Sequence, residues 1–297
     1  MKPKITAVVV TYNRKALLAE CLAALEAQVR PPDNIFVIDN ASTDGTEEFF
    51  ATYAPTHFTL RYERLKTNIG GAGGFNYGIA LAYQDGCDWV WVMDDDTIAT
   101  PMALSALLDG LAFSESKQIS PLIMASRVNW TDGTPHPMNM PKVFGNDWDM
   151  TYACLEKQML PIRSTSFVSL LLSTQAVKQF GLPIADYFIW SDDVEYSARV
   201  LRDNIGFVVS TSVVEHKTKT KHTPLDIYSG RLYFAVRNAL WLLKSPAWNR
   251  KERLLLLVSN ISSWGEYLKQ GRFSWAIIKN LAKPIFDGIF KSPRMES

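Results

Sequence analysis

Residues 89–97 read W-V-W-V-M-D-D-D-T, which is five apolar residues followed by three consecutive carboxylates and a threonine. An apolar run in which aromatic and β-branched residues alternate is typical of a central strand that is buried on both faces. Because buried charge is costly, carboxylates at the end of such a strand must be exposed, paired or gathered around a cation. Carboxylate oxygens suit Mg²⁺ or Mn²⁺. The stretch therefore indicates either a solvated acidic turn or a metal site at Asp94, Asp95 and Asp96.

The flanking sequence predicts a parallel α/β sheet. Strand-like runs over residues 5–10, 34–38 and 58–64 alternate with helix-like patterns over residues 15–28 and 75–84. This alternation favours parallel strands joined by right-handed crossovers, and such sheets bind ligands beyond the carboxyl ends of their strands. Polar residues follow every strand, so we expect one site at this edge, built from Thr11, Arg14, Asp39, Asn68, Asp94, Asp95 and Asp96.

A glycine-rich stretch precedes the helix expected at residues 75–84. Residues 68–74 read N-I-G-G-A-G-G, with four glycines in five residues. Glycine lets the backbone approach a ligand closely, and the free N–H groups at a helix start favour anions. The spacing matches neither of the common nucleotide-binding glycine motifs. It indicates either a flexible turn or, beside a carboxylate metal site, a cradle for a diphosphate and a sugar, which we favour.

The middle of the chain is less regular. Residues 114–160 are rich in Pro, Gly, Asn, Trp and Met, and they predict a loop-rich excursion that shapes an acceptor cleft. Hydrophobic fragments around residues 122–128 look like an edge strand. A further strand is expected over residues 166–172, and a short helix over residues 174–180.

Two acids follow an aromatic run in residues 187–199, Y-F-I-W-S-D-D-V-E-Y-S-A-R. They fall in the first turn of a predicted helix, where capping and the helix dipole favour negative charge. Capping, together with an ion pair between Glu195 and Arg199, does not account for both Asp192 and Asp193. A carboxylate held at a helix start beside a hydrophobic wall is a good position for a general base.

A strand predicted over residues 206–214 leads to His216. A lone histidine is more often structural than a ligand, but this one ends a strand in a chain that already has a candidate metal site. The basic run at residues 217–223 is either a solvated charge run or a lid that covers a phosphate.

Composition bounds the class of protein. A chain of 297 residues with 47% hydrophobic and 21% charged residues fits one large α/β domain or two small ones. The three cysteines have no ligand spacing, which indicates reduced thiols in a cytosolic setting. The first residues show no signal peptide, and no uncharged run is long enough to span a bilayer. We therefore expect a soluble or peripheral protein.

Charge is divided unevenly along the chain. Residues 1–216 carry 16 basic and 25 acidic residues, whereas residues 217–297 carry 15 basic and 5 acidic residues among many aromatic ones. Such basic, aromatic helices can lie in an anionic membrane interface. They can also pack onto the body, or between the subunits of a homo-oligomer. The acidic body and the lack of any recognition motif argue against nucleic-acid binding.

Together these motifs resemble the inverting glycosyltransferases of family two, which have the GT-A fold. The resemblance rests on V-V-V-T-Y-N-R at residues 8–14, D-N-A-S-T-D-G-T at 39–46, the glycine stretch, the triple aspartate, D-D-V-E-Y-S-A-R at 192–199, and His216. The glycine stretch, F-I-W-S-D-D-V-E-Y at 188–196 and Y-F-A-V-R-N at 233–238 are most similar to the galactofuranosyltransferase and rhamnosyltransferase branch.

The resemblance implies a GT-A catalytic domain over residues 1–223, with a mostly parallel Rossmann-like sheet flanked by helices. Its donor-binding half would be about residues 1–113, its acceptor half about residues 114–223, and residues 224–297 would form a helical extension. The implied reaction is inverting transfer of galactofuranose from UDP-galactofuranose to a glycan, with Mn²⁺ or Mg²⁺ as cofactor. From the basic, aromatic tail we expect a lipid-linked acceptor at the cytoplasmic face of the membrane, in bacterial polysaccharide synthesis.

Three alternatives stay open. The donor can be dTDP-rhamnose or another UDP-sugar. The chain can also be a catalytically silent scaffold that binds nucleotide sugars. A nucleotidyltransferase or phosphotransferase would use carboxylates, metal and phosphates too, although it explains the acid pair less well.

The resemblance also implies roles for individual residues. Asp193 would be the general base, supported by Asp192, while Trp190 and Asp192 would contact the acceptor. The metal would be held by Asp94, Asp96 and His216. The donor would be bound by Thr11, Tyr12, Arg14, Asp39, Asn68, Gly70, Gly71, Gly73, Gly74, Asp94 and Asp95.

Overall fold

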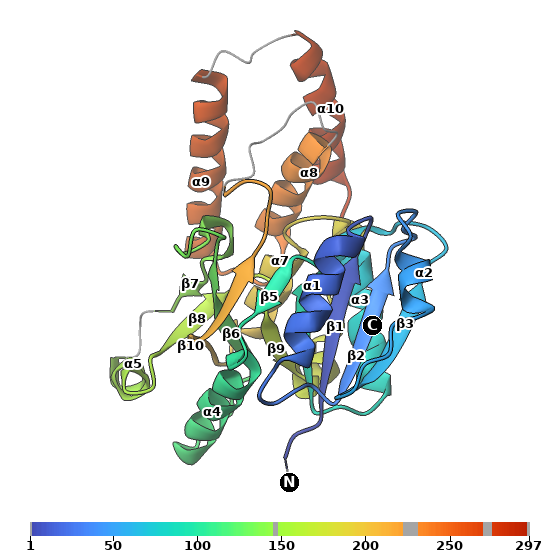
Figure 1. Cartoon of the computed structure of the whole chain (residues 1–297). Helices are drawn as coiled ribbons and strands as arrows, with labels where there is room; N and C mark the ends of the chain where they lie inside the picture. Colours follow the sequence, from blue (N-terminus) through green and yellow to red (C-terminus); the bar gives the residue numbers. More distant parts are fainter. Residues whose placement is uncertain (1, 145–147, 222–230, 270–274, 296–297) are drawn as a thin grey trace.

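The computed structural model describes residues 2–144, 148–221, 231–269 and 275–295 of the chain. These residues form a ten-stranded sheet in the order β3-β2-β1-β4-β9-β6-β10-β8-β7, with β5 paired to β10. Helices lie on both sides of the sheet, and three C-terminal helices extend beyond one end of it (Figure 1). The expected α/β fold with a mostly parallel central sheet and a helical C-terminal extension is confirmed.

The first four strands in sequence pair with one another in parallel. The apolar runs that predict β1, β2 and β4 are almost completely buried. The register places Thr11 opposite Asp39 and Val10 opposite Asp94, so the polar strand ends meet at one edge, as the sequence predicts. The strands are β1 (Ile5–Thr11), β2 (Asn34–Asp39), β3 (Thr59–Arg64) and β4 (Trp89–Asp94).

Two helices cover opposite faces of this half of the sheet. Alternate residues of a strand point to opposite faces, so Ile5 and Val9 share a core cluster with α1 (Lys15–Glu26). Val8 and Val10 share another with α3 (Gly70–Gln84). The short helix α2 (Thr46–Phe50) lies between β2 and β3 in the chain.

The helix predicted to start at residue 75 begins at Gly70 instead, so that prediction is wrong. The cause is tertiary contact. A Cβ atom at Gly74 would lie 2.6 Å from Cγ1 of Val10, and one at Gly78 would lie 2.4 Å from Cγ1 of Val8. Glycine therefore lets α3 approach β1 closely, which offsets the roughly 1 kcal/mol that each glycine costs in a helix interior.

The second half of the sheet mixes parallel and antiparallel pairs. β6 (Ile123–Asn129) lies between β9 (Leu170–Ser173) and β10 (Gly206–His216) and is largely buried. The edge position expected for residues 122–128 is therefore wrong. The strand expected over residues 166–172 starts only at Leu170, because β9 inserts antiparallel between β4 and β6 over a short stretch. Local hydrophobic patterns do not reveal such an insertion.

The helix predicted over residues 174–180 is confirmed as α6 (Thr174–Phe180). Three α-helices and two 3₁₀-helices also connect the strands of this half. The remaining elements are β5 (Thr97–Ala99), α4 (Ala103–Ser116), η1 (Pro137–Asn139), β7 (Lys142–Val143), α5 (Trp148–Leu155), β8 (Met159–Ser164), η2 (Ala185–Tyr187) and α7 (Asp192–Val200).

The C-terminal region consists of α8 (Arg231–Lys244), α9 (Arg250–Lys269) and α10 (Trp275–Phe290). α8 lies against α10, and Leu232 and Val236 form their own small core with Leu281. The part of the expected helical extension that precedes Arg231 lies outside the described residues. Within the described ranges, no helix combines the length and the apolar character needed to cross a membrane.

Candidate active site

A cleft of about 1170 Å³ opens where the carboxyl ends of β1 and β4 meet the end of β10 and the start of α7. Both halves of the sheet line it, and so does α8 through Arg231. Residues from both sides of the domain boundary expected at residue 223 thus line the cleft. That boundary stays a prediction. Its charged lining includes Arg14, Asp94, Asp96, Asp192, Asp193 and His216.

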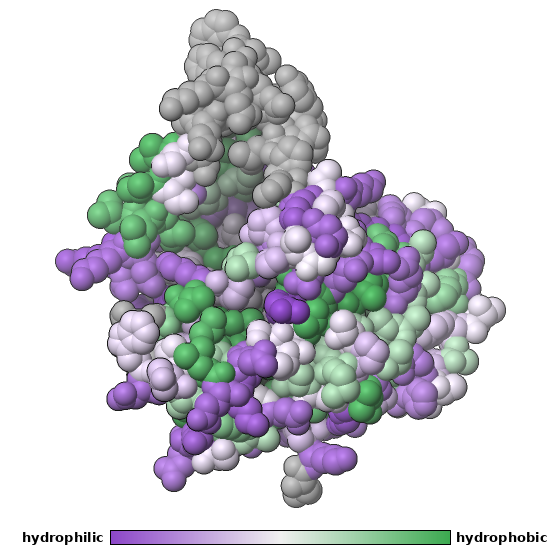
Figure 2. All heavy atoms as spheres, turned by 60° about the vertical axis from the view of Figure 1, so that its left-hand side comes forward, coloured by the Kyte–Doolittle hydropathy of each residue, from purple (hydrophilic) through white to green (hydrophobic). Residues whose placement is uncertain are grey.

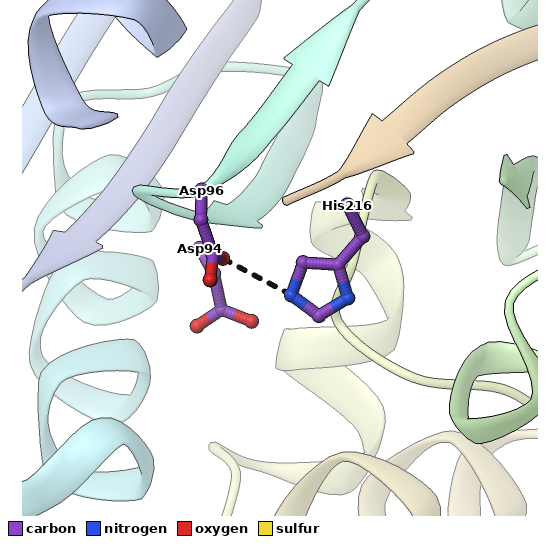
Figure 3. A group of neighbouring side chains, drawn as sticks. All are labelled: Asp94, Asp96 and His216. Atoms are coloured by element: carbon purple, nitrogen blue, oxygen red, sulfur yellow. Dashed lines mark ion pairs between the residues drawn. The ribbon is translucent and has the colours of Figure 1, made fainter. Parts of the chain in front are cut away.

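Asp94, Asp96 and His216 point toward one another in this cleft (Figure 3). Asp94 is the last residue of β4, and His216 is the last residue of β10. The short strand β5 pairs antiparallel with β10 and sets Thr97 opposite His216, which brings the preceding Asp96 to the histidine. One ligand atom from each of the three residues lies within 4.8 Å of the other two.

Asp96 is held as an anion by His216 and Arg14. Nε2 of His216 lies 3.0 Å from its Oδ1, and Nη1 of Arg14 lies 2.5 Å from its Oδ2. Burial alone would raise the pKa of Asp96, but His216 and Arg14 outweigh it and hold the pKa below its ordinary value. Burial by itself would lower the pKa of His216, but the neighbouring Asp96 outweighs burial and raises the pKa of His216 above its ordinary value.

The donor set fits a divalent cation. Apart from Nε2 of His216 at 3.0 Å, the described part of the chain offers no hydrogen-bond donor to the buried Oδ1 of Asp96. Burial and the charge of Asp96 raise the pKa of Asp94 to about 6. The negative charges of these two carboxylates are therefore not fully compensated by the surrounding residues. A cation held by two carboxylate oxygens and an imidazole nitrogen would neutralise this excess negative charge.

Asp95 is not among the residues that line the cleft. It is buried, accepts a hydrogen bond of 2.7 Å from Oγ1 of Thr11, and lies 3.3 Å from Nη1 of Arg14. Burial raises the pKa of Asp95 to about 7, although Arg14 and Thr11 oppose the shift. Asp95 and Thr11 therefore form a support behind Arg14, which itself lines the cleft.

Two other residues that the sequence placed in the donor site also lie outside the cleft lining. Asp39 is completely buried and accepts hydrogen bonds from the Ser42 amide at 2.9 Å and from the Tyr62 hydroxyl at 2.6 Å. Asn68 is exposed, and its Oδ1 accepts the Gly70 amide at 2.7 Å. Both residues shape the turns that lead into the site.

The glycines at the start of α3 have different surroundings. Gly71 lines the cleft and has open space where a Cβ atom would be. Gly73 and Gly74 lie against the side chains of Ile69 and Val10. Gly70 has a φ of +79°, and a Cβ atom there would lie 2.0 Å from the carbonyl oxygen of Phe188. The start of α3 is thus in direct contact with the loop that precedes α7.

The acid pair opens α7 and lines the cleft. Burial, reinforced by the charge of Asp193, raises the pKa of Asp192 well above its ordinary value. Burial also raises the pKa of Asp193 to about 6. Ser191 is the N-cap residue of α7, but its side chain makes no capping hydrogen bond. The predicted ion pair between Glu195 and Arg199 is confirmed at 3.1 Å.

The loop before α7 is strained. Phe188, Trp190 and Ser191 have φ values of 66°, 64° and 70°. Phe188 is the centre of a tight turn, in which the Ile189 amide donates to the Tyr187 carbonyl at 2.8 Å. Non-glycine residues in such conformations cost about 1–3 kcal/mol each and persist only where their surroundings hold them.

Sequence reasoning assigned no role to three residues that support the site. Asn139 lies beside His216, while Arg237 and Asn238 of α8 lie beside the strained loop. Arg237 and Asn238 belong to the Y-F-A-V-R-N stretch, which was noted only as a similarity. The available signal was chemical, since Arg and Asn are seldom buried in a helix unless they are paired.

The basic run after β10 is described as far as Lys221, so the end of the predicted lid lies outside the described residues. Lys217 pairs with Glu20 at 2.6 Å, and Lys221 pairs with Asp132 at 2.7 Å. Lys217 and Lys219 line the cleft. The lid function stays a prediction.

Comparison with known sequences identifies relatives over most of the chain. The family profile described as glycosyl transferase family 2 matches residues 6–170. The chain is 30% identical over 261 residues to galactofuranosyltransferase GlfT1 of Mycolicibacterium smegmatis, covering 82% of this chain and 83% of that protein. It is 26% identical over 288 residues to N-acetylglucosaminyl-diphospho-decaprenol L-rhamnosyltransferase of Mycobacterium tuberculosis, covering 84% and 90%.

Solved structures share the fold at low sequence identity. TarS 1-349 of S. aureus in complex with UDP-GlcNAc superposes with a TM-score of 0.64 at 16% identity, over 96% of this chain and 80% of that one. GalNAc-T7 with UDP, GalNAc and Mn²⁺ gives a TM-score of 0.59 at 12% identity, over 80% and 48%. At such identities the likeness establishes the architecture alone.

Proposed function

This chain belongs to glycosyl transferase family 2 and has the GT-A fold, and on that premise we propose that it is a metal-dependent inverting galactofuranosyltransferase. The donor would be UDP-galactofuranose and the acceptor a lipid-linked glycan. One observation carries the proposal: a single cleft contains both the Asp94, Asp96 and His216 group and the acid pair. Sugar transfer needs charge neutralisation at the leaving diphosphate and a base for the acceptor hydroxyl, and the cleft supplies residues for both.

The first group serves the donor. Asp94, Asp96 and His216 would hold Mn²⁺ or Mg²⁺, which when bound supplies Lewis-acid neutralisation of the departing diphosphate. Arg14 keeps Asp96 ionised and presents its guanidinium to the same cleft. Tyr12 and Gly71 complete the proposed donor contacts, because both line the cleft. The buried Thr11, Asp39 and Asp95 would then support the donor site from behind.

The acid pair serves the acceptor. Asp193 takes the proton of the acceptor hydroxyl as that oxygen bonds to the anomeric carbon, and the bond from this carbon to the diphosphate oxygen breaks. The attack comes from the opposite face, so the anomeric configuration inverts. A pKa of about 6 suits the base role, because Asp193 is then mostly ionised at neutral pH yet still basic enough to take a proton. Asp192 lines the cleft beside Trp190, where its carboxyl would hydrogen-bond the acceptor.

Similarity to a rhamnosyltransferase supports dTDP-rhamnose as the second candidate donor. A donor screen separates the two. Binding and slow hydrolysis would be measured with UDP-galactofuranose, UDP-galactopyranose, UDP-glucose, UDP-N-acetylglucosamine and dTDP-rhamnose, each with and without Mn²⁺ or Mg²⁺. We expect metal-dependent binding and turnover with UDP-galactofuranose. Preference for dTDP-rhamnose would replace the proposed sugar, and equal activity after chelation would remove the metal from the proposal.

A lipid-linked acceptor requires contact with a membrane surface. α9 exposes Leu254, Leu255, Leu257, Val258 and Ile261, each with at least 42% of its surface accessible. Figure 2 shows hydrophobic side chains gathered below the grey atoms, where Figure 1 places α9. The exposed basic residues Arg250, Lys251 and Arg253 precede this patch, which suits an anionic lipid surface.

Flotation with liposomes tests the membrane contact. We expect the protein to float with vesicles that contain anionic lipid, and to float less when Leu254, Leu255 and Val258 are all replaced by Ser. Exchanging Arg250 and Lys251 for Gln should weaken flotation on anionic vesicles only. Absence of flotation with every lipid composition would leave the helices as a protein-contact surface.

A further inference from the structure

The loop that leads into the acid pair is held by one side chain of α8. Nδ2 of Asn238 donates to the carbonyl oxygens of Tyr187 at 3.1 Å, Ile189 at 2.7 Å and Trp190 at 3.0 Å. Asn238 is completely buried. Its two amide hydrogens are therefore shared among three carbonyls of one loop, and no other residue type of this size offers such a pair of donors.

Arg237 fixes the orientation of that amide and adds two bonds of its own. Its Nε and Nη2 donate to Oδ1 of Asn238 at 3.0 and 2.8 Å, so a flipped amide would direct N–H groups at the guanidinium. Nη2 also lies 2.8 Å from the carbonyl oxygens of Asp186 and Tyr187. The guanidinium carbon lies 4.0 Å from the centre of the Trp241 ring, which supports it from the helix side.

The opposite side of the loop is held by α3. The Ala72 amide donates to the Phe188 carbonyl at 3.2 Å, and this close approach depends on glycine at position 70. Every carbonyl from residue 186 to residue 190 thus accepts a hydrogen bond from α3 or α8. A half-buried loop with three positive φ values requires this degree of support.

We infer that Arg237 and Asn238 are positioning residues that hold Trp190 and the acid pair in the geometry required for sugar transfer. This inference rests on the proposed function of the same site. It makes α8 part of the active site rather than a separate appendage. Because Leu232 and Val236 of α8 pack against α10, the C-terminal helices help to set the position of the loop at residues 186–190.

Substitution of Asn238 tests the inference, with a matched control on the same helix. Asn238→Asp keeps the side-chain size and the oxygen that accepts from Arg237. It replaces the donating amide nitrogen with an oxygen, which would face the three carbonyl oxygens of the loop. Asn238→Ala removes the contact altogether. Tyr233→Phe is the control, because it removes the bond to Asp287 and leaves every contact with the loop in place. Arg237→Lys serves as a second test if either Asn238 variant fails to fold.

Two readouts are needed for the full-length protein. Hydrogen exchange should become faster at the amides of Phe188 and Ile189 in the Asn238 variants and stay unchanged in Tyr233→Phe. kcat should fall by about 10²-fold, which is the usual consequence of misplacing reacting groups by about 1 Å. The Kd of the nucleotide sugar should change by less than about threefold, because neither Arg237 nor Asn238 lines the cleft.

Each outcome decides the matter. Wild-type kcat together with wild-type exchange in Asn238→Asp or Arg237→Lys would overturn the inference. Equal losses of kcat in Asn238→Asp and Tyr233→Phe would reduce α8 to a general stabilising element. Hydrogen exchange at Phe188 and Ile189 does not depend on the donor or acceptor. It therefore still shows whether Arg237 and Asn238 hold the loop if the donor screen refutes galactofuranosyl transfer.

Discussion

Nδ1 of His216 lies 2.8 Å from Oδ1 of Asn139, and Nε2 of the same ring faces Asp96 at 3.0 Å. Asn139 donates through its own Nδ2 to Ser166 at 3.0 Å, so its oxygen is free to accept from the histidine. In a neutral, metal-bound ring the proton would therefore lie on Nδ1, and the lone pair of Nε2 would be available to the metal. Asn139, the last residue of η1, thus orients the proposed metal ligand His216.

Asn139→Ala should weaken binding of Mn²⁺ by about 10–100-fold, because the loss of such an outer hydrogen bond frees the ring to rotate. Mn²⁺ affinity would be measured by electron paramagnetic resonance in the presence of UDP. Asn139→Asp keeps an acceptor oxygen and should retain more affinity than the alanine variant. Unchanged Mn²⁺ affinity in Asn139→Ala would show that the bond does not orient His216.

Asp193→Asn should reduce kcat by about 10²–10⁴-fold, since the amide cannot accept the acceptor proton. The Kd of the nucleotide sugar should stay close to that of the wild type. Asp203→Asn, an exchange at an exposed acid just beyond the same helix, serves as the control and should leave kcat unchanged. Substantial turnover by Asp193→Asn would exclude this residue as the base.

The pH dependence of kcat should show an acid limb near pH 6. Burial raises the pKa of Asp193 to about 6, and the base works only when it is deprotonated. Activity should therefore fall about tenfold for each unit below this pH, far above the range near 4 where an exposed aspartate titrates. The profile would be recorded at saturating metal and donor. An acid limb at pH 4 would place the base elsewhere or show it to be solvated.

The same pKa shift makes a prediction about stability. A carboxyl whose pKa is raised by folding binds its proton more tightly in the folded state, so its contribution to stability falls as the pH rises from about 4 through about 6. Asp193→Asn should therefore be more stable than the wild type at pH 7.5, by about 1–3 kcal/mol, and nearly equal to it at pH 4. Urea unfolding at both pH values measures the difference. A destabilised variant at pH 7.5 would contradict the burial of this charge.

Gly70 and Gly71 form a matched pair for testing the contact between α3 and the loop at Phe188. Gly70→Ala would set a Cβ atom 2.0 Å from the Phe188 carbonyl oxygen at a φ of +79°, whereas Gly71→Ala meets nothing within 4 Å. We expect Gly70→Ala to lower the free energy of unfolding by about 1–3 kcal/mol or more. Gly71→Ala should be neutral or stabilising by up to about 1 kcal/mol. Thermal unfolding compares them, and equal effects would mean that the loop adjusts freely.

Much of the site was predictable because it depends on strand ends. Hydrophobic runs mark β1, β4 and β10, and the residues that follow them, Arg14, Asp94 and Asp96, meet at one edge for topological reasons. The glycine stretch was harder to interpret, because glycine disfavours helices locally and only close contact with β1 reveals why α3 contains it. Its direct proximity to the loop at Phe188 was likewise invisible in the sequence.

By itself, the sequence determined the alternation of strands and helices, the candidate ligands and the acid pair, because burial patterns and residue chemistry are local properties. Only the tertiary structure decided which polar side chains enter the cleft and which support it. Asn139 lies 77 residues from His216 in the chain, and Asn238 lies 49 residues from Ile189. Such hydrogen bonds arise when distant segments come together and bury polar groups that must then be paired, a requirement that no local pattern of residues records.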